Sequence, residues 1–115
     1  DEVTTTDATI ISEANQGNFR DYEIVPEDYG LKRAGIKDLL GGENISDNAA
    51  IITDILKGAR GPKRDIVILN SACAIYAANR APSVKEGIRF AEESIDSGRA
   101  YEKLQLLKRL SNEKN

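Results

Sequence analysis

The sequence DIVILNSACAIYAANRA, residues 65–81, is the most apolar stretch of this 115-residue chain. Its length, its small residues and Asp65 at its start predict a helix of roughly four turns rather than a buried strand. A helix that is apolar on nearly every side must be covered on nearly every side. Asn70 and Ser71 then need internal hydrogen-bond partners, so we expect structural roles for both. Cys73 is expected to be a buried, unreactive thiol with a raised pKa.

Two more helices are predicted downstream of this stretch. Ser83-Val84-Lys85-Glu86 matches the S-x-x-E capping box, in which side chains bond the exposed amides of a helix start. The helix that it opens carries an apolar stripe and is expected to end near Gly98. The last helix is expected over residues 99–110, followed by a frayed tail. The stripe consists of Val84, Ile88, Ala91 and Ile95.

Upstream of residue 65, the pattern predicts two helices and a basic loop. A short helix is expected around Ile36–Leu40, closed by Gly41-Gly42. A longer one, Asp47–Lys57, is expected to be capped by Ser46. The loop Lys57–Arg64 has four basic residues in eight positions. A solvated turn is the favoured interpretation of this loop, and a phosphate-contacting loop is the alternative.

The first quarter of the chain predicts a β-hairpin. Residues 8–14 and 19–25 are strand-like, a Gly/Asn turn separates them, and Pro26 follows. A two-stranded ribbon is only marginally stable in water without further strands or a covering layer. The hairpin therefore either packs on the helices as a small α+β domain or belongs to a sheet whose other strands lie upstream. We favour the second arrangement.

The composition narrows the classes of protein to consider. Apolar residues make up 40% of the chain, the net charge is −3 and the pI is about 5.0, which disfavours a nucleic-acid binder. No apolar run approaches the roughly 20 residues needed to cross a bilayer. The lone Cys73 favours a reducing, cytoplasmic setting. The chain has no His, and because it has no Met we expect a processed or truncated segment.

The acidic pair Asp1-Glu2 is the remaining candidate for chemistry. The glycine-containing loops match neither the Walker nor the dinucleotide-binding pattern, and no histidine is present to serve as a base. Carboxylates are hard oxygen ligands that suit Mg²⁺, which is usually shared with substrate phosphates. An ordinary acidic terminus is the alternative. The threonines that follow are expected to enter a strand rather than to take part in catalysis.

Five short motifs, taken in order, resemble the anthranilate phosphoribosyltransferase family. Their order and spacing match that family's C-terminal third over almost the whole chain. They are Asp1-Glu2 with Val3 and the hydroxyls, Asp28-Tyr29-Gly30, Gly41-Gly42 with Asn48, Arg64 to Asn70, and Ile95-Asp96-Ser97-Gly98.

This resemblance implies an α/β fold. Residues 1–115 would be the C-terminal part of a nucleoside-phosphorylase/phosphoribosyltransferase-like α/β domain, here a β-hairpin followed by about five helices. The rest of that domain and an N-terminal helical domain, through which the family usually forms homodimers, would lie upstream.

The implied activity is transfer of the phosphoribosyl group of phosphoribosyl pyrophosphate to anthranilate, in tryptophan biosynthesis, with Mg²⁺. By resemblance, Asp1 and Glu2 would bind that metal, whereas the pyrophosphate loop and the anthranilate contacts would lie upstream. The segment alone would then be inactive. Two alternatives are a non-catalytic helical interaction module and a related nucleoside phosphorylase-type enzyme. The acidic pair favours an enzyme that handles pyrophosphate over the phosphorylase.

Overall fold

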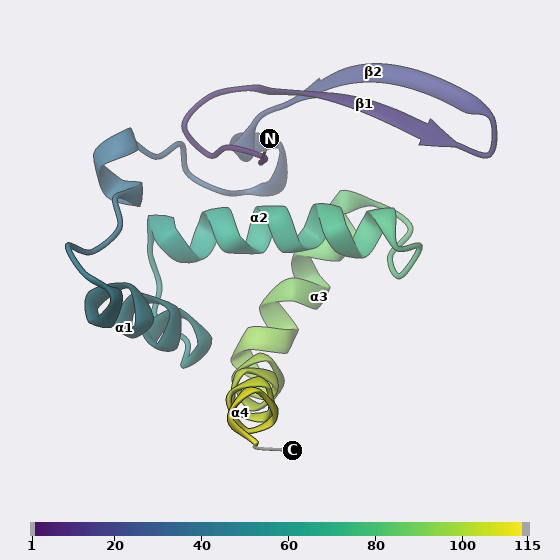
Figure 1. Ribbon diagram of the computed structural model, residues 1–115. Helices are drawn as coiled ribbons and strands as arrows, with labels where there is room; N and C mark the ends of the chain where they lie inside the picture. Colours follow the sequence, from purple (N-terminus) through teal and green to yellow (C-terminus); the bar gives the residue numbers. More distant parts are fainter. Residues whose placement is uncertain (1, 114–115) are drawn as a thin grey trace.

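A hairpin followed by helices is the architecture found in the computed structural model, which describes residues 2–113 (Figure 1). The predicted order of elements is confirmed. The strands are β1 (Thr9–Asn15) and β2 (Asn18–Ile24), the helices are α1 (Ile45–Leu56), α2 (Pro62–Ala77), α3 (Val84–Asp96) and α4 (Arg99–Asn112), and two 3₁₀ turns, η1 (Pro26–Tyr29) and η2 (Ile36–Leu39), lie between β2 and α1.

The described residues contain four α-helices, so the prediction of about five was wrong by one. The segment predicted as a helix around Ile36–Leu40 is the single turn η2. Gly35 and the Gly41-Gly42 pair flank it closely, and one turn of chain is too short to offset the cost of nucleating an α-helix. The Asp38 carboxylate instead accepts a hydrogen bond from the Gly35 N–H at 2.8 Å, which closes the turn.

The core lies between α2 and α3. The expectation that α2 is covered on nearly every side was wrong for the described residues, because three of its side chains are exposed, those of Val67, Ala74 and Ala77. Ile68, Leu69 and Ala72 of α2 are almost fully buried against the apolar stripe of α3. The helices approach closely at Gly87, where an added Cβ would lie 2.6 Å from the carbonyl oxygen of Ala72. Only glycine leaves room for this approach. The α2–α3 pair is therefore the rigid centre of the described residues.

Three helix starts show which capping expectations hold. The Ser83 Oγ accepts a hydrogen bond from the Glu86 N–H at 3.1 Å, as predicted for the start of α3. Helix α1 is capped by Asn44, whose Oδ1 accepts from the Asp47 N–H at 2.9 Å, so the assignment of Ser46 was wrong. Asn44 takes the role because an amide oxygen caps as well as a hydroxyl does. Helix α2 begins at Pro62 rather than Asp65, since proline is favoured in the first turn.

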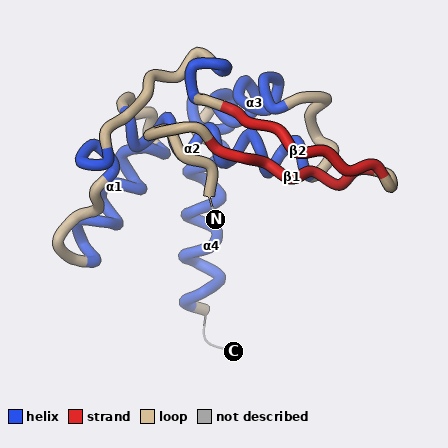
Figure 2. The backbone as a smooth tube through the Cα atoms, turned by 90° about the horizontal axis from the view of Figure 1, so that it is seen from above, coloured by secondary structure: helices blue, strands red, loops and turns tan. Residues whose placement is uncertain are grey.

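The hairpin lies over α2, and Figures 1 and 2 show it running along one side of the helices. Its antiparallel register pairs Thr9 with Ile24 and Asn15 with Asn18. Gln16 and Gly17 both have positive φ (50° and 80°), the geometry of a two-residue turn that matches strand twist. The described residues form no further strand, and of the two strands only Ile24 is buried.

None of the helices in residues 2–113 is both long enough and apolar enough to span a lipid bilayer.

Candidate metal-binding segment

Of the predicted metal ligands, Asp1 lies outside the described residues and Glu2 lies within them. Glu2 is exposed, at the start of the described chain. Within residues 2–113, no group of three or more His, Cys, Asp or Glu side chains lies together to hold a metal ion. An exposed carboxylate fits Mg²⁺, which keeps several waters and binds through one or two carboxylates plus substrate phosphates. The donor set is therefore suitable for a shared site and too small for a protein-only one.

The backbone next to Glu2 is held by a side chain from α2. The Val3 N–H donates to Asn70 Oδ1 at 2.9 Å, and Asn70 Nδ2 donates to the Val3 carbonyl at 2.8 Å. Asn70 Nδ2 also donates to the Ile66 carbonyl at 2.9 Å, one turn earlier in its own helix. The structural role expected for Asn70 is confirmed. Its main partner is the N-terminal segment, which sequence reasoning did not foresee.

The threonines after the pair form a turn, so the expectation that they enter a strand was wrong. The Thr4 N–H donates to Thr9 Oγ1 at 3.1 Å, the Thr6 N–H donates to Thr4 Oγ1 at 3.0 Å, and the hydroxyls of Thr4 and Thr6 lie 2.7 Å apart. Hydroxyls that bond nearby amides favour turns over extended chain. Thr5 is fully buried, and its carbonyl accepts from the Ala34 N–H at 2.9 Å.

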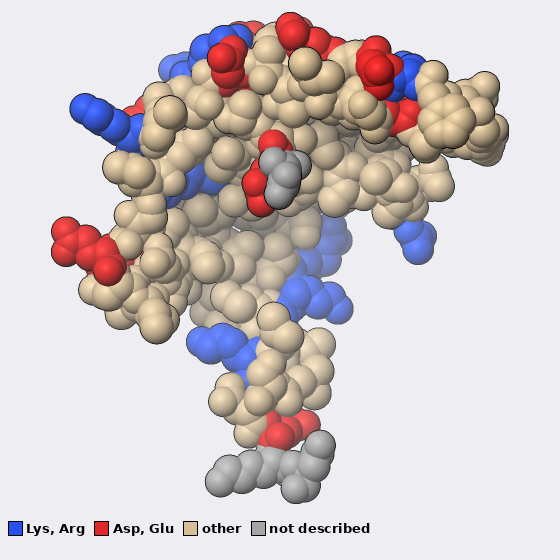
Figure 3. Space-filling model, turned by 45° about the horizontal axis from the view of Figure 1, so that its top comes forward, with Lys and Arg blue, Asp and Glu red and all other residues tan. Residues whose placement is uncertain are grey.

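The solvated turn predicted for Lys57–Arg64 was wrong for Arg64, which is buried in the first turn of α2. The contacts of this basic segment are made within the protein. The Arg64 side chain is 2% exposed, and its Nη1 lies 2.9 Å from Asp96 Oδ1 on α3. Arg60 Nη2 lies 3.5 Å from the other oxygen of that carboxylate. Lys57 Nζ lies 5.3 Å from the centre of the Tyr101 ring. Basic and acidic side chains are interspersed on the face drawn in Figure 3.

Arg64 holds the pKa of the Asp96 carboxyl below its ordinary 3.8, mainly through their hydrogen bond. Sequence reasoning missed this pair. A helical wheel of α2 alone gives no reason to single out Arg64, because its partner lies 32 residues away. The only available signal was that Arg64 and Asp96 both belong to motifs of the resemblance.

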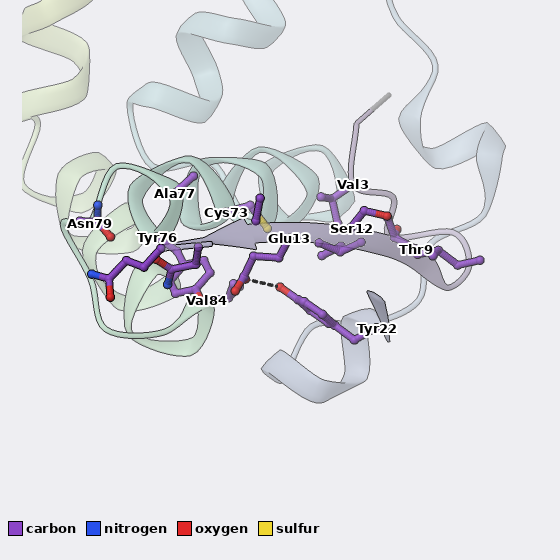
Figure 4. A pocket seen from close by; sticks show the side chains of 15 residues that line it. Val3, Thr9, Ser12, Glu13, Tyr22, Cys73, Tyr76, Ala77, Asn79 and Val84 are labelled. Atoms are coloured by element: carbon purple, nitrogen blue, oxygen red, sulfur yellow. Dashed lines mark hydrogen bonds between the residues drawn. The ribbon is translucent and has the colours of Figure 1, made fainter. Parts of the chain in front are cut away.

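A groove of about 560 Å³ separates β1 from α2. Figure 4 shows Glu13 and Tyr22 of the hairpin beside it, with Tyr76 and Cys73 of α2 opposite. Tyr22 Oη donates to Glu13 Oε1 at 3.0 Å, and Arg20 Nε donates to Glu13 Oε2 at 3.2 Å. Val3 lines the same groove, so the hairpin, α2 and the N-terminal segment meet there.

The pKa values around the groove follow from these contacts. Burial, reinforced by the Glu13 carboxylate, raises the pKa of Tyr22 to about 12. The hydrogen bond from Arg20 is the main reason why the pKa of Glu13 lies below its ordinary value. Burial raises the pKa of the Cys73 thiol, as expected. Cys73 is only partly buried and lines the groove, so the expectation of a fully buried thiol was wrong. Tyrosine and cysteine thus stay neutral near pH 7, and we assign this cluster a structural role.

Residues 1–101 match the family described as glycosyl transferase family, a/b domain. The chain belongs to this family. The match covers the hairpin and the core helices and reaches the start of α4.

Within that class, the chain is similar to anthranilate phosphoribosyltransferases. It is 50% identical over 115 residues to the enzyme of that name from Methanocorpusculum labreanum, covering all of this chain and 34% of the relative. It is 52% identical over 103 residues to that of Clostridium kluyveri, covering 90% of this chain and 30% of the relative. The resemblance noted from the motifs is thereby confirmed. The chain spans about a third of the length of these relatives.

Solved structures give the same result. Anthranilate phosphoribosyltransferase from Thermus thermophilus superposes with a TM-score of 0.69 at 43% identity, over 77% of this chain and 26% of that one. The Saccharomyces cerevisiae enzyme, in complex with phosphoribosyl pyrophosphate and Mg, superposes with a TM-score of 0.79 at 26% identity, over 91% of this chain and 30% of that one. Hairpin and helices therefore have the arrangement of an anthranilate phosphoribosyltransferase segment.

Proposed function

We propose that this chain is the C-terminal part of a longer anthranilate phosphoribosyltransferase. That enzyme would transfer the phosphoribosyl group of phosphoribosyl pyrophosphate to the amine of anthranilate, in the biosynthesis of tryptophan. The observation that carries the proposal is 50% identity over the full chain to an enzyme of that name. The rest of the α/β domain and a helical domain would lie upstream, and the protein would be a cytoplasmic homodimer joined through the helical domain, without nucleic-acid or membrane partners.

Within this function, Asp1 and Glu2 would hold Mg²⁺ against the pyrophosphate group. When bound, Mg²⁺ would neutralise negative charge that develops on the pyrophosphate as it leaves ribose C1. The two carboxylates would fix the position of the Mg²⁺ ion and would leave most of its coordination positions to water and phosphate oxygens. No proton-transferring residue is needed in this segment, because an aromatic amine is a weak base that needs little proton abstraction to attack. The segment thus contributes positioning and electrostatics.

The remaining contribution of the chain is a scaffold. Helices α2 and α3 form the core, and the N-terminal segment rests on α2 through the hydrogen bonds between Val3 and Asn70. Contacts to the ribose, the pyrophosphate and anthranilate would come from upstream residues. The 115-residue chain on its own is therefore expected to be inactive.

The test is to replace Asp1 by Asn and Glu2 by Gln together in the full-length enzyme. Losing metal-based charge stabilisation of several kcal/mol should lower kcat/KM about 100-fold or more and raise the Mg²⁺ concentration needed for half-maximal rate. Steady-state rates over a Mg²⁺ titration measure both effects. The pair Glu92→Gln and Glu93→Gln on α3 removes the same charge and serves as the control. An unchanged rate and metal profile in the first variant would refute the assignment of the pair.

A further inference from the structure

The Asn70 amide is the contact that fixes the backbone beside the acidic pair. Both polar groups of the Val3 main chain, its N–H and its carbonyl, are bonded to this one side chain, at 2.9 and 2.8 Å. A neighbouring strand would satisfy a backbone in the same way. The Asn70 side chain thus makes the two hydrogen bonds to the Val3 main chain that a neighbouring strand would otherwise make.

The orientation of this amide is determined by its partners. Oδ1 faces an N–H group, while Nδ2 faces two carbonyl oxygens, those of Val3 and Ile66. Rotating the amide by 180° would set its NH₂ against the Val3 N–H and its oxygen against both carbonyls. All three hydrogen bonds would be lost. The contact therefore has one stable geometry.

The segment after Val3 is fixed by independent contacts, so motion there cannot compensate for a change at Asn70. Thr5 is fully buried and bonded to Ala34, and the Thr4 and Thr6 hydroxyls close the turn. The Val3 side chain packs against the α2–α3 core. Consecutive Cα atoms are about 3.8 Å apart, so a shift of Val3 passes directly to Glu2.

The support behind Asn70 is a helix whose neighbouring side chains are deeply buried. Ile68, Leu69 and Ala72, which flank Asn70 in sequence, are each at most 1% exposed. The described start of the chain lies close to the middle of α2 (Figure 1), where Val3 bonds Asn70. A ligand held by a rigid element through a hydrogen-bonded supporting residue has the arrangement required for accurate placement. Loss of a group that hydrogen-bonds a metal ligand directly typically costs about 10–100-fold in metal affinity or activity, and this range is the upper bound for Asn70, which acts through the Val3 backbone.

We propose that Asn70 is a positioning residue for the metal-binding pair: its amide holds the Val3 backbone so that the adjacent carboxylates meet Mg²⁺ at the pyrophosphate. The inference rests on the proposed function. Asn70 touches neither substrate nor metal, and it acts through residues 2 and 3. A purely structural Asn70 would support the fold without affecting how tightly the metal is bound.

The experiment measures Mn²⁺ binding to the full-length enzyme in the presence of pyrophosphate, by the change in the Mn²⁺ paramagnetic resonance signal relative to the same Mn²⁺–pyrophosphate mixture without enzyme, because pyrophosphate itself binds Mn²⁺. Asn70→Ala is the main variant, because alanine preserves the helix. We expect its Mn²⁺ affinity to fall by up to about 10–100-fold. Higher Mg²⁺ should restore part of the rate. Asn70→Gln keeps the amide but is one methylene longer, and it should bind Mn²⁺ weakly even if Asn70→Ala is too unstable to purify.

Two further variants separate the possible outcomes. Asn44→Ala removes an asparagine that also bonds the backbone, at the cap of α1, and should lower the melting temperature without changing Mn²⁺ affinity. Wild-type Mn²⁺ affinity in folded Asn70→Ala or Asn70→Gln, with weakened binding in Glu2→Gln, would overturn the positioning role and leave the proposed function standing. Unchanged Mn²⁺ affinity in Glu2→Gln would refute the assignment of Glu2 as a metal ligand. It would also refute the positioning role of Asn70, which depends on that assignment.

Discussion

The α2–α3 pair and the hairpin are stabilised in different ways. The helix pair buries Ile68, Leu69 and Ala72 against the apolar stripe of α3 and supplies its own core. The hairpin buries only Ile24, and it leaves Ile10 at 76% and Phe19 at 82% exposure. Its cohesion comes from the backbone ladder and from polar pairs such as Glu13 with Arg20.

This difference indicates which region depends on the rest of the protein. Hydrophobic burial is the dominant favourable contribution to folding, and the helices obtain it within residues 2–113. An isolated two-stranded hairpin is at best marginally stable. The proposed upstream part of the domain would supply the missing cover for Ile10 and Phe19. We therefore expect α2 and α3 to be protected in this chain alone and the hairpin to open readily.

The largest effect is expected from truncating the core. Leu69→Ala should lower the local stability of α2 and α3 by about 2–5 kcal/mol, because a fully buried leucine leaves a cavity. The matched hairpin change, Phe19→Ala, should alter hairpin stability by about 0.5 kcal/mol or less, because an exposed ring loses little contact. Hydrogen exchange of the 115-residue chain, read peptide by peptide, measures both regions. Equal effects in the two regions would contradict the comparison.

A pair of glycines provides the next test. Gly87→Ala places a Cβ against the Ala72 carbonyl and should cost about 1–3 kcal/mol by separating α2 from α3. Gly17→Ala meets no atom within 4 Å, and its only cost is the positive φ of 80°, about 1 kcal/mol. The first change should reduce protection in both helices, and the second should reduce it in the hairpin alone. Helices unaffected by Gly87→Ala would mean that the close approach is not required.

The effects of the two ion pairs should depend on pH, and the pair of the buried Arg64 should matter more than that of the exposed Arg20. The pKa of Asp96 is lowered in the fold, so its stabilisation is present above the ordinary value of 3.8 and is lost as pH falls through the lower folded value. The melting temperature of Asp96→Asn should therefore be lower than that of the unsubstituted chain at neutral pH, and the difference between the two melting temperatures should narrow below pH 3.8. Melting curves followed by circular dichroism at several pH values measure it.

Glu13→Gln is the hairpin counterpart of Asp96→Asn. The pKa of Glu13 is lowered from 4.5 in the fold, so the ionised Glu13 stabilises the hairpin above that pH, as Asp96 stabilises the helices. This stabilisation begins to be lost as pH falls below 4.5. Glu13→Gln should increase exchange in β1 and β2 and leave the melting of the helices unchanged. A pH-dependent change in α2 would show that the two regions are more tightly coupled than their packing indicates.

The sequence predicted the elements better than the contacts between them. Hydrophobic periodicity and capping residues located α2, α3 and the hairpin, because these patterns are local. The turn formed by Thr4–Asp7 was missed, since β-branched residues favour strands unless their hydroxyls find nearby amides. The pairs Arg64–Asp96 and Val3–Asn70 join residues far apart in sequence and could not be found from periodicity. The proposed positioning of Glu2 rests on the second of these pairs.

The hydrogen bonds between Val3 and Asn70 also set an order of events during synthesis. They join positions 67 residues apart, so the Val3 main chain lacks these two hydrogen bonds until α2 has been made. At about 5–20 residues per second, a ribosome needs roughly 3–13 s to add that length. Closing so long a loop costs entropy that only a formed α2 can offset. Val3 therefore gains these hydrogen bonds only after α2 has been made.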